Sequence, residues 1–77
     1  MEEFLRFVIS ELVEYPDEVT ITKSETSGAV AFYVAMRQSD CGRIIGRGGH
    51  TIHALRSLLQ ASAQKHKLKK ATLEIIE

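Results

Sequence analysis

Hydrophobic and polar positions recur along this chain at two different spacings, one typical of helices and one typical of strands. In residues 2–15 the apolar positions follow the i, i+3, i+4, i+7 spacing of an amphipathic helix, at Leu5, Val8, Ile9 and Leu12. Phe4 and Val13 widen this apolar stripe. We expect the helix to end before Pro16, because the residue that precedes a proline is pushed out of the α region.

Two segments then alternate with a period of two residues, as strands do. In the first, the positions that alternate with Thr and Ser are Val19, Ile21 and Lys23. The segment "ETSGAV" is a turn around Gly28, and the second strand follows with one face formed by Val30, Phe32, Val34 and Met36. The short connection between the two strands favours an antiparallel hairpin.

The second half of the chain predicts two helices and a strand. Ser39 or Asp40 can cap a brief helix that runs through Ile45, although Gly42 weakens this prediction. After a cluster of glycines, a long helix from about Gly49 to His66 has an inner stripe formed by Ile52, Leu55, Leu58, Leu59, Ser62 and Ala63. The last segment, "ATLEIIE", predicts a strand over residues 71–77 whose inward positions are Ala71, Leu73 and Ile75.

The order of these elements indicates an α+β fold. Two helices separate the second strand from the third, and a crossover of that length usually returns to form a parallel neighbour with a right-handed connection. The expected product is a three-stranded mixed sheet with the helices packed on its apolar face. At 77 residues, we expect one domain over residues 1–77.

Composition places the chain among folded proteins, with 44% hydrophobic and 26% charged residues. No apolar run approaches the roughly 18 residues that a membrane span needs. The single cysteine, Cys41, cannot form an internal disulfide and is expected to be a small packing residue. A reducing, cytoplasmic setting follows as the expectation.

Charge is balanced overall but unevenly distributed. Residues 1–25 carry seven acidic against two basic side chains, a net of −5, whereas residues 37–70 carry eight basic side chains against Asp40 alone, a net of +7. An acidic first third and a basic second half are typical of a protein that presents one face to a polyanion.

The stretch "CGRIIGRGGHTI" holds four of the five glycines, and it matches neither of two common phosphate-binding motifs. The sequence G-x-x-x-x-G-K-[ST] is absent, because no Lys-Ser or Lys-Thr pair follows the glycines. The sequence G-x-G-x-x-G fails because Thr51 stands where the third glycine is needed. A nucleotide-hydrolysing site and a dinucleotide site are therefore excluded.

The segment "IIGRGGHTI" instead resembles the I-G-x-x-G-x-x-I signature of the KH domain, a module that binds RNA or single-stranded DNA. In KH domains a G-x-x-G loop joins two helices and clamps about four nucleotides of the nucleic-acid backbone. The expected helix–loop–helix context is present here. The element order α-β-β-α-α-β resembles the type II, bacterial arrangement, with three helices covering one face of the sheet.

With no companion domain, the chain resembles the small bacterial single-KH proteins of the KhpA/YlqC family. The resemblance implies a non-enzymatic, cytoplasmic RNA-binding protein without a cofactor. It further implies a role in post-transcriptional regulation or as an RNA chaperone, a partner of the KhpB type, and a link to cell shape and elongation. A homodimer would raise the avidity of a weak single groove.

Residue chemistry indicates how such a loop would bind RNA. Gly46 and Gly49 allow a tight turn and leave room for a sugar-phosphate chain. We expect N–H groups near Gly49, His50 and Thr51 to be available for an anion, since the first amides of a helix lack intrahelical partners. Arg47 can pair with a phosphate, and His50 can make a polar contact. Gly48 departs from the polar or charged residue that is more usual in the family.

Other residues complete the expected RNA-binding set. The predicted apolar floor for the bases is formed by Ile44, Ile45 and Ile52. In type II domains the loop before the last strand forms the opposite rim, and here it contains Lys65, Lys67, Lys69 and Lys70. Arg43 and Arg56 fit a solvated helix surface as well as an RNA contact, and the lysines alone fit a solvated helix end.

Two other classes of function, a metal-binding protein and an enzyme, find little support in the sequence. His50 and His53 could suggest a metal site, but zinc needs three or four protein ligands and only Cys41 is nearby, so no metal is expected. Near the loop no nucleophile–base pair or carboxylate constellation predicts an enzyme. The remaining alternative is a protein-interaction module with a KH fold that does not bind nucleic acid, docking through its acidic N-terminal helix.

Overall fold

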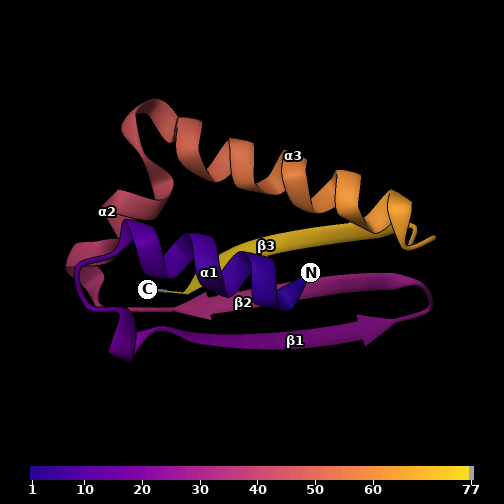
Figure 1. Ribbon diagram of the computed structural model, residues 1–77, viewed down its shortest axis with the longest axis horizontal. Coiled ribbons are helices and arrows are strands. Elements are labelled where there is room, and N and C mark those ends of the chain that lie inside the picture. The colour runs from indigo at the N-terminus through magenta and orange to yellow at the C-terminus, as the bar shows by residue number, and fades with distance from the viewer. Residues whose placement is uncertain (77) are drawn as a thin grey trace.

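The computed structural model describes residues 1–76, and its helices and strands follow the predicted order (Figure 1). They are α1 (Glu2–Leu12), β1 (Thr20–Thr26), β2 (Ala29–Ala35), α2 (Gln38–Ile45), α3 (His50–Lys65) and β3 (Lys70–Ile76). Short 3₁₀ turns at Pro16–Glu18 and Arg47–Gly49 precede β1 and α3. Glu77, the last residue of the predicted strand 71–77, lies outside the described residues.

The three strands form one mixed sheet in the order β1-β2-β3. β1 pairs with β2 in antiparallel fashion through a hairpin, and β3 runs parallel to β2, as predicted. The two central residues of the hairpin turn, Ser27 and Gly28, both have positive φ, 46° and 84°. This combination is typical of the type I′ turn, whose twist matches that of the flanking strands.

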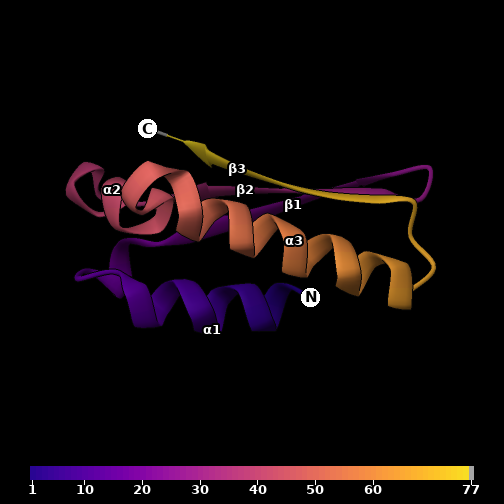
Figure 2. The same cartoon turned by 90° about the horizontal axis from the view of Figure 1, so that it is seen from above.

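All three helices lie on one side of the sheet, so the molecule has two layers (Figure 2). The inward face of the central strand is Val30, Phe32 and Val34, each at most 1% exposed. Helices and sheet bury a common core that includes Leu5, Ile9, Val13, Ile21, Ile44, Ile52, Leu55, Leu59, Ala63, Ala71 and Leu73. This confirms the predicted α+β fold with helices on the apolar face.

The predicted helical stripes are wider than the faces that the helices bury. On α3 the buried positions are Ile52, Leu55, Leu59 and Ala63, whereas Leu58 is 52% exposed. On α1 the prediction was also wrong for Phe4 and Leu12, which are both exposed. A helix that lies against one flat layer buries only a narrow stripe, so apolar residues on its flanks remain in solvent.

The start of α2 differs from the prediction. Its N-cap is Arg37 without a side-chain capping bond, so neither Ser39 nor Asp40 caps the helix. The Asp40 carboxylate is instead fully buried and accepts the backbone N–H groups of Glu14 and Tyr15, each at 3.0 Å. Asp40 therefore fastens α2 to the segment that follows α1.

Gly42 and Cys41 are neighbours within α2. Gly42 does not prevent the predicted helix: it lies inside α2, where an added Cβ would meet nothing within 4 Å. Cys41 is buried, as expected of a packing residue. Within residues 1–76, none of the helices has the length and apolar character needed to cross a membrane.

Candidate nucleic-acid interface

The loop between α2 and α3 depends on a glycine at position 46. The Gly46 N–H closes α2 by donating to the Gly42 carbonyl at 2.9 Å, and the chain then turns with φ +77°. A Cβ at Gly46 would lie 2.3 Å from Thr51 Oγ1 and 2.7 Å from Thr51 Cβ. Since real Cβ atoms do not approach other atoms so closely, the first turn of α3 packs directly on the bare backbone of Gly46.

Gly49, at the other end of the loop, is required for a different reason. It is the N-cap of α3 and adopts the left-handed conformation, with φ +78° and ψ 11°. A Cβ there would meet nothing within 4 Å, so the space above this residue is open. Gly48 between them also has positive φ, +64°. The two ends of the loop are thus a packing contact at Gly46 and an open backbone at Gly49.

The amides at the start of α3 are less available than predicted. The Gly49 N–H donates to the Gly46 carbonyl at 3.1 Å, and the His50 N–H donates to the Arg47 carbonyl. The prediction that these two amides lack partners was wrong, because a 3₁₀ turn precedes the helix and uses them. An anion at this loop would therefore rely mainly on side chains.

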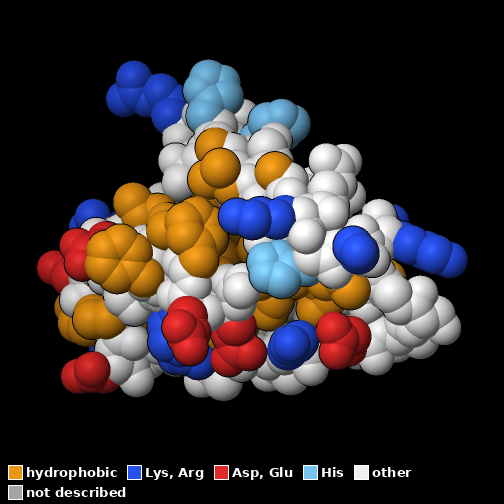
Figure 3. All heavy atoms as spheres, turned by 45° about the vertical axis from the view of Figure 1, so that its right-hand side comes forward, with side chains coloured by type: hydrophobic (Ala, Val, Ile, Leu, Met, Phe, Trp, Pro, Cys, Tyr) orange, Lys and Arg blue, Asp and Glu red, His pale blue; other side chains and the backbone are white. Residues whose placement is uncertain are grey.

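Arg47 is the side chain best placed for that role. It is exposed, and among residues 1–76 no acidic group forms a salt bridge with it. In Figure 3, basic and histidine side chains project at the top of the molecule, where Figure 1 places this loop. The His50 ring lies beside Gly48, since a Cβ on that glycine would be 3.7 Å from His50 Nε2.

Arg43, by contrast, is already paired. Its guanidinium lies 3.5 Å from an Asp40 carboxylate oxygen and 3.8 Å from one of Glu14. These acids lie at the junction of α2 with the segment after α1. Arg43 therefore faces that junction, and only its half-exposed surface adds to the positive field near the loop.

The predicted apolar floor is reduced to one residue. Ile44 has no exposed surface and Ile52 is 7% exposed, because both belong to the core. Ile45, the last residue of α2, is 38% exposed. Because Ile44 and Ile52 are buried in the core, Ile45 is the member of the predicted floor whose side chain is exposed.

The predicted lysine rim lies at the other end of α3 from the glycine loop (Figure 1). A helix of 16 residues separates the two loops, which corresponds to about 24 Å. At this end the Lys69 N–H donates to the Gly28 carbonyl at 2.7 Å, so the lysine loop lies against the β1–β2 hairpin. The predicted basic residues thus lie in two separate regions, one at the glycine loop before α3 and one at the lysine loop after it.

Lys67 has a backbone conformation that the sequence did not reveal. It has φ +60°, and α3 ends with bonds from Leu68 N–H to the Ala63 carbonyl and from Lys67 N–H to the Gln64 carbonyl. This is the Schellman pattern, in which the residue at the Lys67 position is usually glycine. Because "QKHKLKK" contains no glycine, nothing in the sequence indicates a left-handed residue at this helix end.

Arg56 proves to be a structural residue in part. Its Nε and Nη2 donate to the Leu73 carbonyl at 3.1 and 3.0 Å, and the Ala71 N–H donates to Gln60 Oε1 at 3.1 Å. Side chains one turn apart on α3 thereby satisfy backbone groups of the edge strand β3.

Among the described residues, no group of three or more His, Cys, Asp or Glu could hold a metal ion.

Comparison with known proteins decides the family. The family model described as "KhpA/KhpB, KH domain" matches residues 2–75. The chain belongs to this family. A protein named RNA-binding protein KhpA from Listeria monocytogenes is 38% identical over 77 residues, which is 100% of both chains. Proteins of the same name from Chlamydia pneumoniae and Treponema pallidum are 36% and 40% identical, covering 100% and 99% of this chain and 97% and 94% of theirs.

Family membership agrees with the observed architecture. The order α-β-β-α-α-β with a mixed sheet is consistent with the type II KH fold. The relatives carry the name of RNA-binding proteins rather than of enzymes, in agreement with the expected non-enzymatic role. No solved structure matches the chain.

Proposed function

We propose that the loop Gly46–Gly49 clamps the backbone of about four nucleotides of single-stranded RNA. The observation that carries this proposal is the open backbone at Gly49, next to an exposed Arg47 that has no acidic partner among residues 1–76. The relatives, named RNA-binding proteins, support the same class of ligand.

In this proposal each loop residue has a separate role. Gly49 lets the sugar-phosphate chain approach the backbone, and the Arg47 guanidinium pairs with a phosphate. Gly48 keeps the tip of the loop free of a side chain, while the His50 ring beside it offers a polar contact. Ile45 supplies exposed apolar surface for a base.

Lys67 and Lys69 belong to a more distant part of the RNA path. They lie beyond the C-terminal end of α3, about 24 Å from the glycine loop by the length of the helix. We therefore assign them to nucleotides outside the four that the glycine loop holds. Single-stranded DNA is a second ligand in this proposal, since the contacts at the loop are to phosphate and base and none is to a ribose 2′-hydroxyl.

The setting proposed for this activity is a cytoplasmic, post-transcriptional or RNA-chaperone role, with a link to cell shape and elongation. A single KH groove binds weakly, so we propose association with a KhpB-type KH protein or with a second copy of this chain. The exposed apolar side chains Phe7 and Leu58, 65% and 52% exposed, support a protein partner.

The test is the affinity of short single-stranded RNA for charge-reversed loop variants, measured by fluorescence anisotropy. We expect Arg47→Asp and Gly48→Asp each to weaken binding by about ten-fold or more, because each places a negative charge where a phosphate approaches. Aspartate tolerates the left-handed backbone better than most residues, so the fold should survive at position 48.

Arg6→Asp is the matched control, because it makes the same charge change on α1, where Arg6 pairs with Glu2 at 3.8 Å. The control should bind RNA like the wild type. Wild-type protein that shows no salt-dependent affinity for RNA would instead favour the protein-interaction module.

A further inference from the structure

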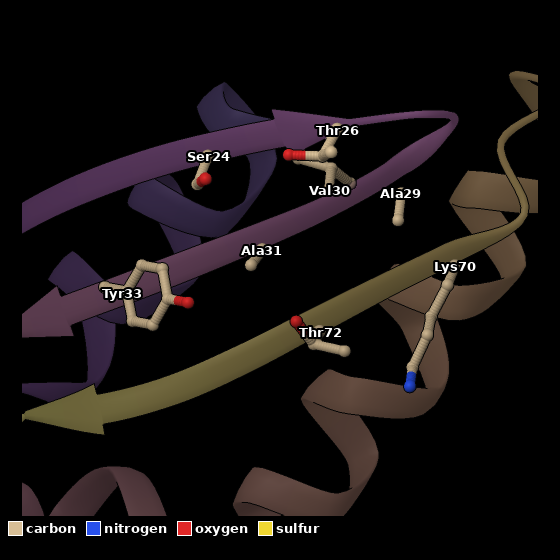
Figure 4. A pocket seen from close by; sticks show the side chains of 8 residues that line it. All are labelled: Ser24, Thr26, Ala29, Val30, Ala31, Tyr33, Lys70 and Thr72. Carbon is tan, nitrogen blue, oxygen red and sulfur yellow. The ribbon is translucent and has the colours of Figure 1, made fainter.

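The face of the sheet opposite the helices carries a hollow that the glycine loop does not use (Figure 4). Its volume is about 310 Å³, and side chains from all three strands line it. The lining residues are Ser24, Thr26, Ala29, Val30, Ala31, Tyr33, Lys70 and Thr72. This surface lies on the far side of the sheet from α2 and α3, and so it is separate from the proposed clamp.

The hollow exists because the outward side chains of the central strand β2 are small here, whereas β1 and β3 place larger side chains on either side. Ala29 and Ala31 form the floor, and Tyr33, 39% exposed, forms a wall at one end. Four residues of strand separate Tyr33 from Ala29, about 13 Å, and three strands span about 10 Å. A flat floor of this size with an aromatic wall fits one nucleobase and its ribose.

The charged groups at the two ends of the hollow differ: Lys70 lines it, whereas Glu74 lies beside Tyr33, outside the lining. Lys70 pairs in register with Ala29, at the end away from the tyrosine, and Glu74 pairs in register with Tyr33. Both are exposed and, by strand alternation, share the outer face with Thr72. A cation at one end and a carboxylate at the other would orient a nucleotide, with its phosphate toward Lys70 and an amino-bearing base edge toward Glu74.

The positive charges near the hollow indicate the path by which an RNA strand would reach it. Lys67, Lys69 and Lys70 follow one another from the end of α3 into β3, and within residues 1–76 none of them is in a salt bridge. This run of unneutralised cations leads from the helix layer to the outer face of the sheet. A polyanionic strand that passes the lysine loop would therefore arrive at the hollow.

We propose that this hollow binds one nucleotide of an RNA strand that is longer than the four nucleotides held by the glycine loop. The proposal rests on the proposed function, since it requires RNA as the ligand. The base stacks against Tyr33 over Ala31, the hydroxyls of Ser24 and Thr72 contact its edge, and Lys70 pairs with its phosphate. Adenine, guanine and cytosine each carry an amino group that donates a hydrogen bond to the Glu74 carboxylate, whereas uracil has no amino group.

The experiment is an NMR titration of the ¹⁵N-labelled protein with oligoadenylate RNAs of about 4 and about 12 nucleotides, one matched to the groove and one longer. We expect both RNAs to shift the amides of Gly46–Gly49, and only the longer one to shift those of Ala31, Tyr33 and Thr72. Oligouridylate of the longer length should move the sheet amides less.

Ala31→Leu fills the hollow, and Ala35→Leu is its matched control on the same strand and face, outside the lining. We expect Ala31→Leu to bind the longer RNA about ten-fold more weakly, the size of effect given by loss of one stacked base, and to lose only the sheet-face shifts. Ala35→Leu should behave like the wild type. Thr72→Leu fills the hollow from β3 and serves if Ala31→Leu fails to fold.

The outcomes separate the two proposals. Loop shifts without any sheet-face shifts in the wild type, or equal affinities of Ala31→Leu and Ala35→Leu, would overturn the hollow as an RNA site. Sheet-face shifts alone would support the hollow and overturn the clamp, and no shifts at all would overturn both. Adenosine monophosphate that moves the sheet amides when the longer RNA does not would also overturn the assignment to RNA.

Discussion

Thr51 determines which residue can stand at position 46. Its Oγ1 and Cβ occupy the space where a side chain of residue 46 would begin, at 2.3 and 2.7 Å from an ideal Cβ. The contact joins the end of α2 to the first turn of α3, and so it holds the angle at which the loop projects. Gly49 also has positive φ but no such contact, and its ψ of 11° lies in the left-handed helical region, whereas Gly46, with ψ 171°, is in a region that essentially only glycine adopts.

This difference predicts unequal effects of two alanine substitutions. Gly46→Ala must move Thr51 as well as strain the backbone, so we expect the free energy of unfolding to fall by about 3 kcal/mol. Gly49→Ala adds only backbone strain, and we expect a fall of about 1 kcal/mol. Urea denaturation of the two variants measures both, and equal losses would show that the Thr51 contact is unimportant.

Lys67 gives a second prediction at this scale. Because it occupies the left-handed position of a Schellman motif, Lys67→Gly should relieve strain and stabilise the protein by about 0.5 kcal/mol, net of the greater freedom of the unfolded chain. The same change should weaken binding of long RNA by removing a cation. Lys69→Gly is the control, since Lys69 does not have positive φ, and it should not be stabilising.

Among the elements, the contacts that join the end of α1 to the start of α2 are the most charged. Arg37 forms a forked hydrogen bond with Glu18, with Nε lying 3.1 and 3.0 Å from the two carboxylate oxygens. The Arg37 guanidinium also lies over the Tyr15 ring, 3.7 Å from its centroid. Together these contacts tie the 3₁₀ turn before β1 to the segment between β2 and α2.

The Glu18–Arg37 pair predicts a pH dependence of stability. The hydrogen bond from Arg37 lowers the pKa of the Glu18 carboxyl below its usual value of 4.5. A lowered pKa in the folded state contributes stability above the unfolded pKa, and that contribution is lost as pH falls through the folded value. The gap in unfolding free energy between wild type and Glu18→Gln should thus be small, present near neutral pH and absent in acid.

Denaturant titrations of both proteins from neutral pH to below pH 4.5 measure this gap. A gap that stays constant over the whole range would contradict the assignment to the carboxylate. Because both side chains are nearly half exposed, solvent screens the pair, and the expected effect is modest.

The positions of the helices and strands could largely be predicted from the sequence, but which of their side chains are exposed could not. Periodicity predicted the strands and helices because β-alternation and the helical period depend on local sequence. Which of Ile44 and Ile45 faces the core depends on how α2 lies against the sheet, which is a property of packing. The engaged amides of Gly49 and His50 likewise depend on a 3₁₀ turn that no local pattern in the sequence indicated.

At the scale of the whole molecule, a net charge of zero hides two regions of opposite sign. The acidic residues are concentrated in α1 and in the segment between α1 and β1, whereas most of the basic ones lie on α2, on α3 and in the loops at both ends of α3. An RNA strand is therefore attracted by the second half of the chain and repelled by the first. The family resemblance predicted the partner class, and the structure adds that the cations are divided between two ends of one helix.

The salt dependence of RNA affinity tests the central claim most directly, that Arg47 and its loop hold a phosphate. For single strands, log affinity falls with log salt by about 0.7 for each phosphate contact. We predict that Arg47→Ala lowers this slope by about 0.7 relative to wild type, whereas Arg6→Ala leaves it unchanged. Equal slopes for Arg47→Ala and wild type would contradict the account, because they would mean that the loop contacts no phosphate.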